Sequence, residues 1–270
     1  MGTFLAAAVQ LNSTSGEERN LEQAESLIVR AAGYGAAFVA TPENTNFLGP
    51  HDEKVERAQG LDGSVCQRFS ELAKRLKIHL LLGSFNEAGS DATHCRNTSV
   101  LFGPDGVRLA IYRKIHLFDI DLPGELRFLE SETVEAGGEA VTVSTELGRL
   151  GLSICYDLRF AELYRRLRQA GAEIFLVPSA FTQPTGRAHW FALLRARAIE
   201  NQCYLIAPAQ VGRHDDEGLR ESYGHAAVVG PWGTVLATAG DGPGLALAEI
   251  DLGRVARVRR SMPVEDHRRL

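Results

Sequence analysis

Short apolar runs alternate with amphipathic segments along almost the whole chain, and this alternation limits the fold more than any other feature of the sequence. Short apolar runs bounded by turn residues are typical of buried strands, and apolar residues at helical spacing are typical of helices packed on a sheet. The predicted strands are residues 4–10, 36–40, 80–82, 150–154, 174–177 and 204–207, and the predicted helices are residues 21–32, 64–76, 160–169 and 189–201. Strands that alternate with helices in this way predict an α/β fold.

Two hairpin patterns interrupt the strand–helix alternation. Residues 98–102 and 107–112 flank Gly-Pro-Asp-Gly at 103–106, and residues 226–229 and 234–237 flank Pro-Trp-Gly at 231–233. Such turn residues between apolar runs favour antiparallel pairing. The sheets are therefore expected to be mixed. The length and the lack of a linker or repeat favour a single domain over residues 1–270.

Charge and cysteine content exclude several classes of function. A net charge of −5 argues against nucleic acid or an anionic membrane as the main partner. The basic stretch at 254–260 is interpreted as the solvated face of a terminal helix. No apolar run has the length of a membrane span and no signal-peptide pattern opens the chain, so a cytosolic protein is expected. The 4 cysteines form no CxxC pair, so disulfides and structural zinc are not expected.

The segment around Cys155 is the first candidate for chemistry. A predicted strand leads to Cys155, and a predicted helix follows within a few residues. A turn between a strand and a helix presents a side chain above the sheet edge and leaves N–H groups free to stabilise an oxyanion. Taken alone, Cys155 is better explained as a small buried hydrophobic residue, which is the usual state of a free cysteine.

A nucleophilic thiol needs a base, a nearby positive charge, or both. Glu43 follows the predicted strand at 36–40, and Lys114 follows the one at 107–112. If these strands are neighbours, Glu43 and Lys114 would meet Cys155, with Glu43 at the same sheet edge. For each charged residue alone, exposure at the surface is the alternative.

With these residues in place, the sequence resembles the nitrilase, or carbon–nitrogen hydrolase, superfamily. The matching blocks, which appear in order, are TPEN, YRKIHLF, GLSICYDLRFAEL, PSAFTQPTGRAHW, RARAIENQCYLIAPAQVGRH and YGHAAVVGPWGTVLA. The resemblance implies a four-layer α-β-β-α sandwich. It also implies a homodimer, or a higher homo-oligomer, in which the sandwich continues across the interface.

The same resemblance assigns catalytic roles. Cys155 would attack the amide carbonyl, and Glu43 would accept the thiol proton and later activate water. Lys114 and the backbone N–H of Tyr156 would stabilise the oxyanion. A second glutamate that often accompanies this triad corresponds best to Glu130, for which a surface glutamate is the alternative. This chemistry needs neither a metal nor a cofactor.

The residues after the nucleophile favour one branch of the superfamily. Cys-Tyr-Asp at 155–157 is similar to amidases, whereas true nitrilases usually carry Cys-Trp-Glu. Segments 83–87 and 202–214 resemble deaminated glutathione amidases, which we favour, and segment 116–124 resembles omega-amidases acting on α-ketoglutaramate. A carbamoyl-amine hydrolase, a nitrilase and a non-catalytic binding protein with this fold are less favoured interpretations.

Both favoured substrates are small amides that carry carboxylates, so the pocket should contain a cation. Arg159, four residues after the nucleophile, is the first candidate, and a structural ion pair at the start of the next helix is its alternative. The predicted substrate-binding residues are therefore Tyr156, Arg159, Phe181, Thr182 and Thr185, of which the last three are assigned by their family position.

Overall fold

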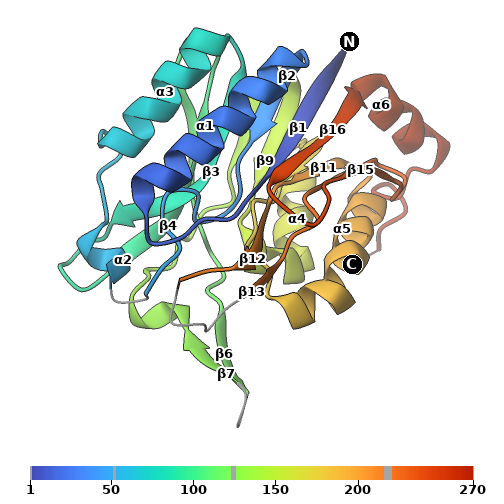
Figure 1. The fold of residues 1–270 in the computed structure, drawn as a ribbon. Helices are drawn as coiled ribbons and strands as arrows, with labels where there is room; N and C mark the ends of the chain where they lie inside the picture. The colour runs from blue at the N-terminus through green and yellow to red at the C-terminus, as the bar shows by residue number, and fades with distance from the viewer. Residues whose placement is uncertain (1, 51–52, 123–125, 216–220, 270) are drawn as a thin grey trace.

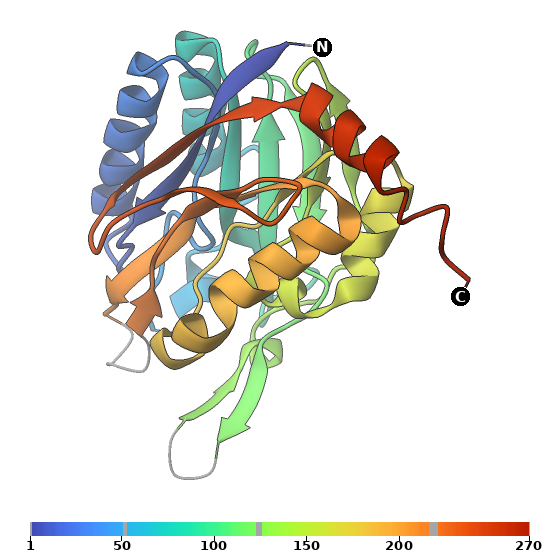
Figure 2. The same ribbon diagram turned by 90° about the vertical axis from the view of Figure 1, so that its right-hand side faces the viewer.

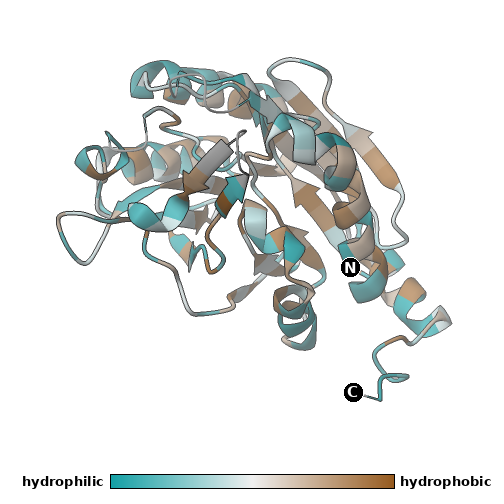
Figure 3. Cartoon of the chain, turned by 90° about the horizontal axis from the view of Figure 1, so that it is seen from below, coloured by the Kyte–Doolittle hydropathy of each residue, from teal (hydrophilic) through white to brown (hydrophobic). Residues whose placement is uncertain are grey.

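The computed structural model describes residues 2–50, 53–122, 126–215 and 221–269. Two packed β-sheets lie between two layers of helices (Figures 1 and 2). Figure 3 colours the strands mostly white or brown and shows many teal, hydrophilic segments on the outer helices. The expected four-layer α-β-β-α sandwich is confirmed by this arrangement.

The first sheet contains five strands from the N-terminal half of the chain and three from the C-terminal half. Its strand order is β13-β12-β1-β2-β3-β4-β5, and β16 also pairs with β1. Strands β1, β2 and β3 are parallel, and β3, β4 and β5 are antiparallel, so the sheet is mixed as expected. The bounds are β1 Thr3–Leu11, β2 Ala36–Ala40, β3 His79–Ala88, β4 Cys95–Phe102, β5 Arg108–Arg113, β12 Ala209–Arg213, β13 Glu221–Tyr223 and β16 Gly244–Asp251. Helices α1 (Glu17–Gly33) and α3 (Ser64–Leu76) cover its outer face (Figure 1).

The second sheet carries most of the C-terminal half. Its order is β15-β14-β11-β10-β9-β8. The bounds are β8 Thr142–Thr145, β9 Gly148–Leu152, β10 Ile174–Leu176, β11 Tyr204–Ala207, β14 Ala227–Val229 and β15 Val235–Thr238. Helices α4 (Ala161–Gln169) and α5 (Gln183–Asn201) cover its outer face (Figure 2). Both predicted hairpins are confirmed, as β4–β5 and β14–β15.

Three further elements lie outside these layers. The short helix α2 (Glu53–Glu56) precedes α3, and α6 (Leu252–Ser261) follows β16. The two-stranded hairpin of β6 (Asp119–Leu122) and β7 (Leu126–Leu129) projects from the body of the molecule (Figures 1 and 2). Pro123 and Gly124, which belong to the segment that resembles omega-amidases, lie outside the described residues.

The side chains of strand β1 alternate between two hydrophobic cores. Ala6 and Ala8 belong to the core that includes the second sheet. Ala7, Val9 and Leu11 belong to the separate core under α1 and α3. Successive side chains of a strand point to opposite faces, and the small alanines allow the two sheets to approach closely. A strand buried on both faces therefore appears as the continuous apolar run seen in the sequence.

Several predicted boundaries are wrong, for local physical reasons. Helix α5 begins at Gln183, not at 189, because Pro184 near its first turn suits a helix start and the first turns carry little apolar periodicity. Strand β3 does not end at Gly83. The register shifts between Leu82 and Phe85, and a Cβ on Gly83 would lie 1.9 Å from the carbonyl oxygen of Thr41. The glycine marks a bulge and a close backbone approach, not a strand end.

Basic residues 254–260 lie on α6, where Arg257 and Arg260 are exposed while Leu252 and Val255 are buried, as the interpretation of a solvated helix face expected. Among the described residues, no helix is both long enough and apolar enough to cross a membrane.

Candidate active site

The three predicted catalytic residues come from loops of two different sheets. Glu43 follows β2 and Lys114 follows β5, which are separated by β3 and β4 in the first sheet. Cys155 follows β9 in the second sheet. The expectation that Glu43 and Cys155 share one sheet edge is therefore wrong. The residues meet because the two sheets pack face to face, so that loops at one end of both sheets surround a common pocket.

All nine predicted site residues line this one pocket. They are Glu43, Lys114, Glu130, Cys155, Tyr156, Arg159, Phe181, Thr182 and Thr185. The pocket also contains residues that sequence reasoning missed, namely Asn44, Lys54, Phe118, Phe128 and Ala180. Lys54 on α2 and the two phenylalanines at the base of the β6–β7 hairpin could not be identified beforehand, because neither element was predicted.

Cys155 sits at the start of a short 3-10 turn, Cys155–Arg159, and not at the end of a regular strand. Its φ of 46° is in the left-handed region, which costs a non-glycine residue about 1–2 kcal/mol. Its N–H donates to the carbonyl of Pro178 at 2.9 Å, which helps to hold this conformation. Strain at a strand-to-helix turn is typical of an exposed nucleophile.

The surroundings of Cys155 keep its thiol protonated at neutral pH. Burial raises the pKa of this thiol well above its ordinary value, and the negative charge of Glu43 raises it further against the opposing effect of Lys114. The side chain is 8% exposed and hydrogen bonds with the Glu43 carboxylate. A thiol in this state becomes a nucleophile only when a base removes its proton, and Glu43 is in contact with it.

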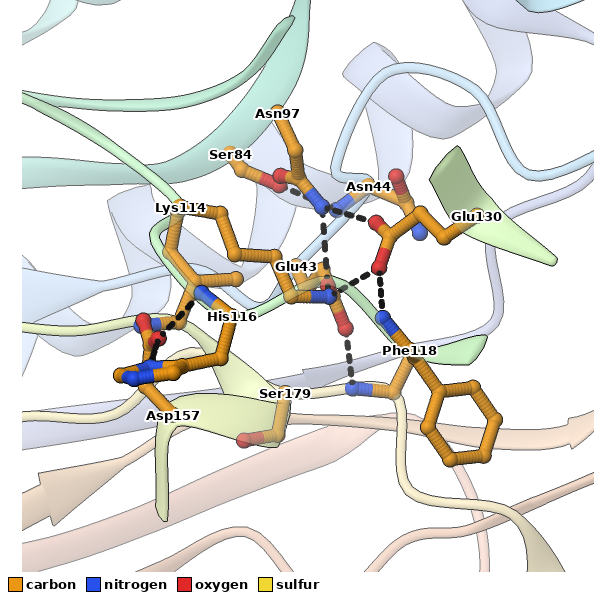
Figure 4. A network of polar contacts seen from close by, with 12 residues as sticks. Glu43, Asn44, Ser84, Asn97, Lys114, His116, Phe118, Glu130, Asp157 and Ser179 are labelled. Carbon is orange, nitrogen blue, oxygen red and sulfur yellow. Dashed lines mark hydrogen bonds and ion pairs between the residues drawn. The ribbon is translucent and has the colours of Figure 1, made fainter. Parts of the chain in front are cut away.

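Lys114 lies between two carboxylates, as Figure 4 shows. Its Nζ is 2.8 Å from Oε1 of Glu43 and 2.8 Å from Oε2 of Glu130, and the side chain is 2% exposed. Burial alone would lower the pKa of Lys114, but the charges of Glu130 and Glu43 outweigh it and hold the pKa well above its usual value. The lysine therefore keeps its charge at every physiological pH.

Fixed donors orient both glutamates (Figure 4). The backbone N–H of Ala180 donates to Glu43 at 3.0 Å, and the N–H of Phe118 donates to Glu130 at 2.7 Å. Asn97 of β4 donates to Glu43 at 2.9 Å and to Glu130 at 3.1 Å. Sequence reasoning missed Asn97, because it lies in the polar first half of β4 and outside the predicted strand at 98–102.

The opposite wall carries the predicted substrate-binding residues. The Arg159 guanidinium lies over the rings of Tyr156 and Phe181, at 5.7 and 5.4 Å from their centroids. In the described part of the chain it makes no ion pair with a carboxylate, and its one hydrogen-bond contact is to the His189 ring nitrogen, at 3.2 Å. Thr182 and Thr185 hydrogen bond to each other at 2.7 Å. Arg159 therefore faces the pocket as a cation and not as half of a structural ion pair.

Comparison with known proteins agrees with this geometry. Residues 5–260 match the family model described as carbon-nitrogen hydrolase. The chain belongs to the carbon–nitrogen hydrolase family. It is 46% identical to a deaminated glutathione amidase from Synechocystis sp., with 99% of each chain covered. It is also 44% identical to the omega-amidase NIT2 of Homo sapiens, covering 98% of this chain and 94% of that one.

A solved structure confirms the fold of this carbon–nitrogen hydrolase. The crystal structure of the C. elegans NitFhit protein superposes with a TM-score of 0.94 at 44% identity. The alignment covers 100% of this chain and 66% of that chain. The sequence resemblance to the nitrilase superfamily is thereby confirmed, and so is the prediction of an enzyme that hydrolyses non-peptide carbon–nitrogen bonds.

No group of three His, Cys, Asp or Glu side chains within the described ranges is arranged to hold a metal ion. Lys114 separates the two pocket carboxylates and already neutralises charge there. The sequence-based expectation of cofactor-free chemistry stays a prediction.

The buried Glu130 carboxylate should make the free energy of unfolding of this carbon–nitrogen hydrolase decrease at acidic pH. Burial would raise the pKa of Glu130, but the charges of Lys114 and Lys54 and the bond from Phe118 lower it to about 2. The ordinary value in an unfolded chain is about 4.3. Because the folded pKa is the lower one, the ionised carboxylate contributes stability that is complete above about pH 4.3 and is lost as the pH falls toward 2.

We therefore expect Glu130→Gln to lower the free energy of unfolding most at neutral pH, with the difference from wild type shrinking between about pH 4.5 and 2. Urea unfolding at a series of pH values measures this difference, and Glu249→Gln, an exposed glutamate on β16, is the control. A difference that stays constant with pH would show that the Glu130 charge does not contribute.

Proposed function

We propose that this chain is an amidase that cleaves the carbon–nitrogen bond of a small carboxylate-bearing amide through a cysteine thioester. The observation that carries the proposal is the contact of the protonated Cys155 thiol with Glu43, beside the charged Lys114, in one pocket. A binding protein would need none of these three groups. Burying the Glu43–Lys114 ion pair costs desolvation energy that such a protein would have no reason to spend.

The proposed reaction uses each group in turn. Glu43 takes the thiol proton as Sγ of Cys155 attacks the amide carbon, and the carbonyl oxygen becomes an oxyanion held by Lys114 and the N–H of Tyr156. Glu43 then delivers the proton to the departing nitrogen, and the C–N bond breaks to leave a thioester. A water molecule gives its proton to Glu43 and attacks the thioester, which releases the acid and restores the thiol.

Glu130 and Asn97 have supporting parts in this proposal. Glu130 holds the second face of the Lys114 ammonium, and Asn97 links the two glutamates. Since Glu43 already bonds to Lys114 and to the N–H of Ala180, its orientation is fixed before substrate enters. Preorganised groups do not have to reorient during the reaction, and this preorganisation is the main source of electrostatic catalysis.

The preferred substrate is deaminated glutathione, with α-ketoglutaramate as the alternative. Each substrate carries a 2-oxo acid carboxylate, and Arg159 and Lys54 supply positive charge to the pocket beyond Lys114. Similarity to the Synechocystis deaminated glutathione amidase supports the first substrate. Similarity to human omega-amidase NIT2 supports the second. The carbamoyl-amine hydrolase and nitrilase activities are less favoured.

A parallel kinetic comparison tests this assignment. Hydrolysis of deaminated glutathione should release cysteinylglycine, and hydrolysis of α-ketoglutaramate should release ammonia, with the same 2-oxo diacid as the common product. We expect kcat/KM to favour deaminated glutathione. A preference for α-ketoglutaramate would identify an omega-amidase. Turnover of neither would contradict the substrate proposal, and carbon dioxide released with ammonia from a carbamoyl amine would support a carbamoyl-amine hydrolase.

Arg159 is expected to bind a substrate carboxylate. Arg159→Met keeps the length of the side chain and removes its charge, which should raise KM for the preferred substrate about 10- to 100-fold, because a charged hydrogen bond contributes about 1.5–3 kcal/mol. Hydrolysis of butyramide, which has no carboxylate, should change much less. Arg187→Met is the matched control. It makes the same substitution at an exposed arginine on α5 that does not line the pocket. Equal losses on both substrates would indicate a structural role for Arg159.

Further proposals concern organisation and location. The family match over residues 5–260 supports one domain over residues 1–270. A homodimer is supported by apolar side chains exposed around one shallow pocket, including Trp232, which is 54% exposed, Ile199 and Met262. Sedimentation velocity at several protein concentrations tests this. The cytosolic location stays a prediction.

A further inference from the structure

Asp157 is a buried carboxylate for which the reaction described above has no use. Its side chain is 0% exposed, yet two donors reach each of its oxygens. Oδ2 accepts from the Tyr112 hydroxyl at 2.6 Å and from the N–H of Ile154 at 2.8 Å. Oδ1 accepts from the N–H of His116 at 3.0 Å and lies 2.7 Å from Nδ1 of the same residue. A fully satisfied buried carboxylate is expensive to desolvate, so its position calls for a physical reason.

These donors come from both sides of the candidate active site. Ile154 directly precedes Cys155, and the N–H of Asp157 returns a bond to the Ile154 carbonyl at 3.0 Å. This reciprocal pair encloses Cys155 and Tyr156 in the strained turn. Tyr112 and His116 lie two residues before and two residues after Lys114, which belongs to the other sheet. Figure 4 shows Asp157 against His116 below Lys114.

We propose that Asp157 is a positioning residue that fixes the spacing between the Cys155 turn and the Lys114 segment. The inference rests on the proposed function, because it assumes that the Cys155 thiol and the Lys114 ammonium act on the same carbonyl group. One carboxylate bonds directly to the backbone on both sides of the gap between the sheets. The attacking sulfur and the oxyanion site are thus set relative to each other before substrate binds.

The arrangement of donors requires a carboxylate and not merely a polar side chain. Each oxygen of Asp157 accepts one backbone N–H, from Ile154 or from His116. In an asparagine, one of these oxygens becomes an NH₂ group, so either orientation of the amide would place a donor against a backbone N–H that cannot rotate away. Burial and the charge of Asp157 hold the pKa of Tyr112 well above its ordinary value, so the phenol also remains a donor.

A per-site kinetic experiment tests the proposal. Asp157→Asn and the matched control Tyr112→Phe, which removes one side-chain donor and leaves both backbone bonds, are alkylated with iodoacetamide. Mass spectrometry then locates and counts the label on Cys155, and kcat per labelled site is the turnover of a parallel unlabelled sample divided by this count. In wild type, loss of activity must follow labelling of Cys155. If it does not, the proposed function fails, whatever Asp157 does.

With wild type behaving as expected, Asp157→Asn should label fully at Cys155 but lose about 100-fold in kcat per labelled site, because a misplacement of about 1 Å can cost that much. KM should change less than about threefold, since the pocket wall around Arg159 is untouched, and Tyr112→Phe should lose less than about tenfold in kcat. A kcat per labelled site equal to wild type would overturn the proposal and leave Asp157 a purely structural role.

If Asp157→Asn does not fold, the double variant Tyr112→Phe/His116→Ala provides the test. This variant removes both side-chain donors and keeps both backbone donors. Because both backbone bonds remain, its kcat per labelled site should fall less than about tenfold. A loss of about 100-fold would show that the side-chain donors set the spacing and would contradict the proposal.

Discussion

Replacing Cys155 by alanine should abolish hydrolysis while leaving the fold intact. Without the thiol no thioester can form, and losses from removing a covalent nucleophile are about 10⁴-fold or larger. The fold should survive because the side chain is small and the turn is held by backbone bonds to Pro178 and by the Ile154–Asp157 pair. Release of the 2-oxo diacid measures activity, and circular dichroism with thermal unfolding measures the fold.

The matched control is Cys203→Ala, which removes a thiol that is equally buried but lies outside the pocket. We expect this variant to keep its activity. The Cys155→Ala protein should also still bind substrate with a Kd close to the wild-type KM, because it retains Arg159 and the aromatic wall. Full activity in Cys155→Ala would contradict the proposed mechanism.

Replacing Lys114 by methionine should damage catalysis and stability together. Loss of one oxyanion donor lowers kcat by about 10²–10³-fold. The loss of the ammonium also leaves Glu43 and Glu130 buried close to each other without the cation between them, and breaking a buried ion pair from one side costs about 3–5 kcal/mol.

A second substitution separates the two effects. Lys114→Met/Glu130→Gln removes one of the two carboxylates that have lost the Lys114 charge. It should recover part of the lost free energy of unfolding, as measured by urea denaturation. Its kcat should stay low, because the oxyanion donor is still missing. Recovery of activity in the double variant would show that Lys114 acts only by neutralising Glu130.

Much of the candidate site could be predicted from the chain alone, because each predicted catalytic residue directly follows a buried apolar run. Cys155, Glu43 and Lys114 were identified in this way, and the resemblance to a family then assigned their roles. Their relative placement could not be derived locally. The apolar run of a strand does not say which of two sheets the strand joins, so Glu43 and Cys155 were expected at one edge and instead lie across the space between the sheets.

Residues that act through tertiary contacts were harder to find. Asn97 and Lys54 have no local pattern that distinguishes them from other polar residues, and each becomes informative only when Glu130 lies beside it. Strands such as β12 (Ala209–Arg213) and β16 (Gly244–Asp251) were missed for a similar reason. They complete the first sheet by pairing with β1, and long-range pairing of this kind leaves little local signal.

The division of the site between two sheets has a consequence for when this enzyme becomes active during folding. The loops of the first sheet supply the proposed base and the ammonium, and those of the second supply the sulfur, so neither sheet alone carries all three proposed catalytic groups. A folding intermediate with both sheets formed but not yet docked would have near-native secondary structure and no activity. Recovery of turnover during refolding would then report the final docking step, because Cys155 has neither Glu43 nor Lys114 beside it until the two sheets meet.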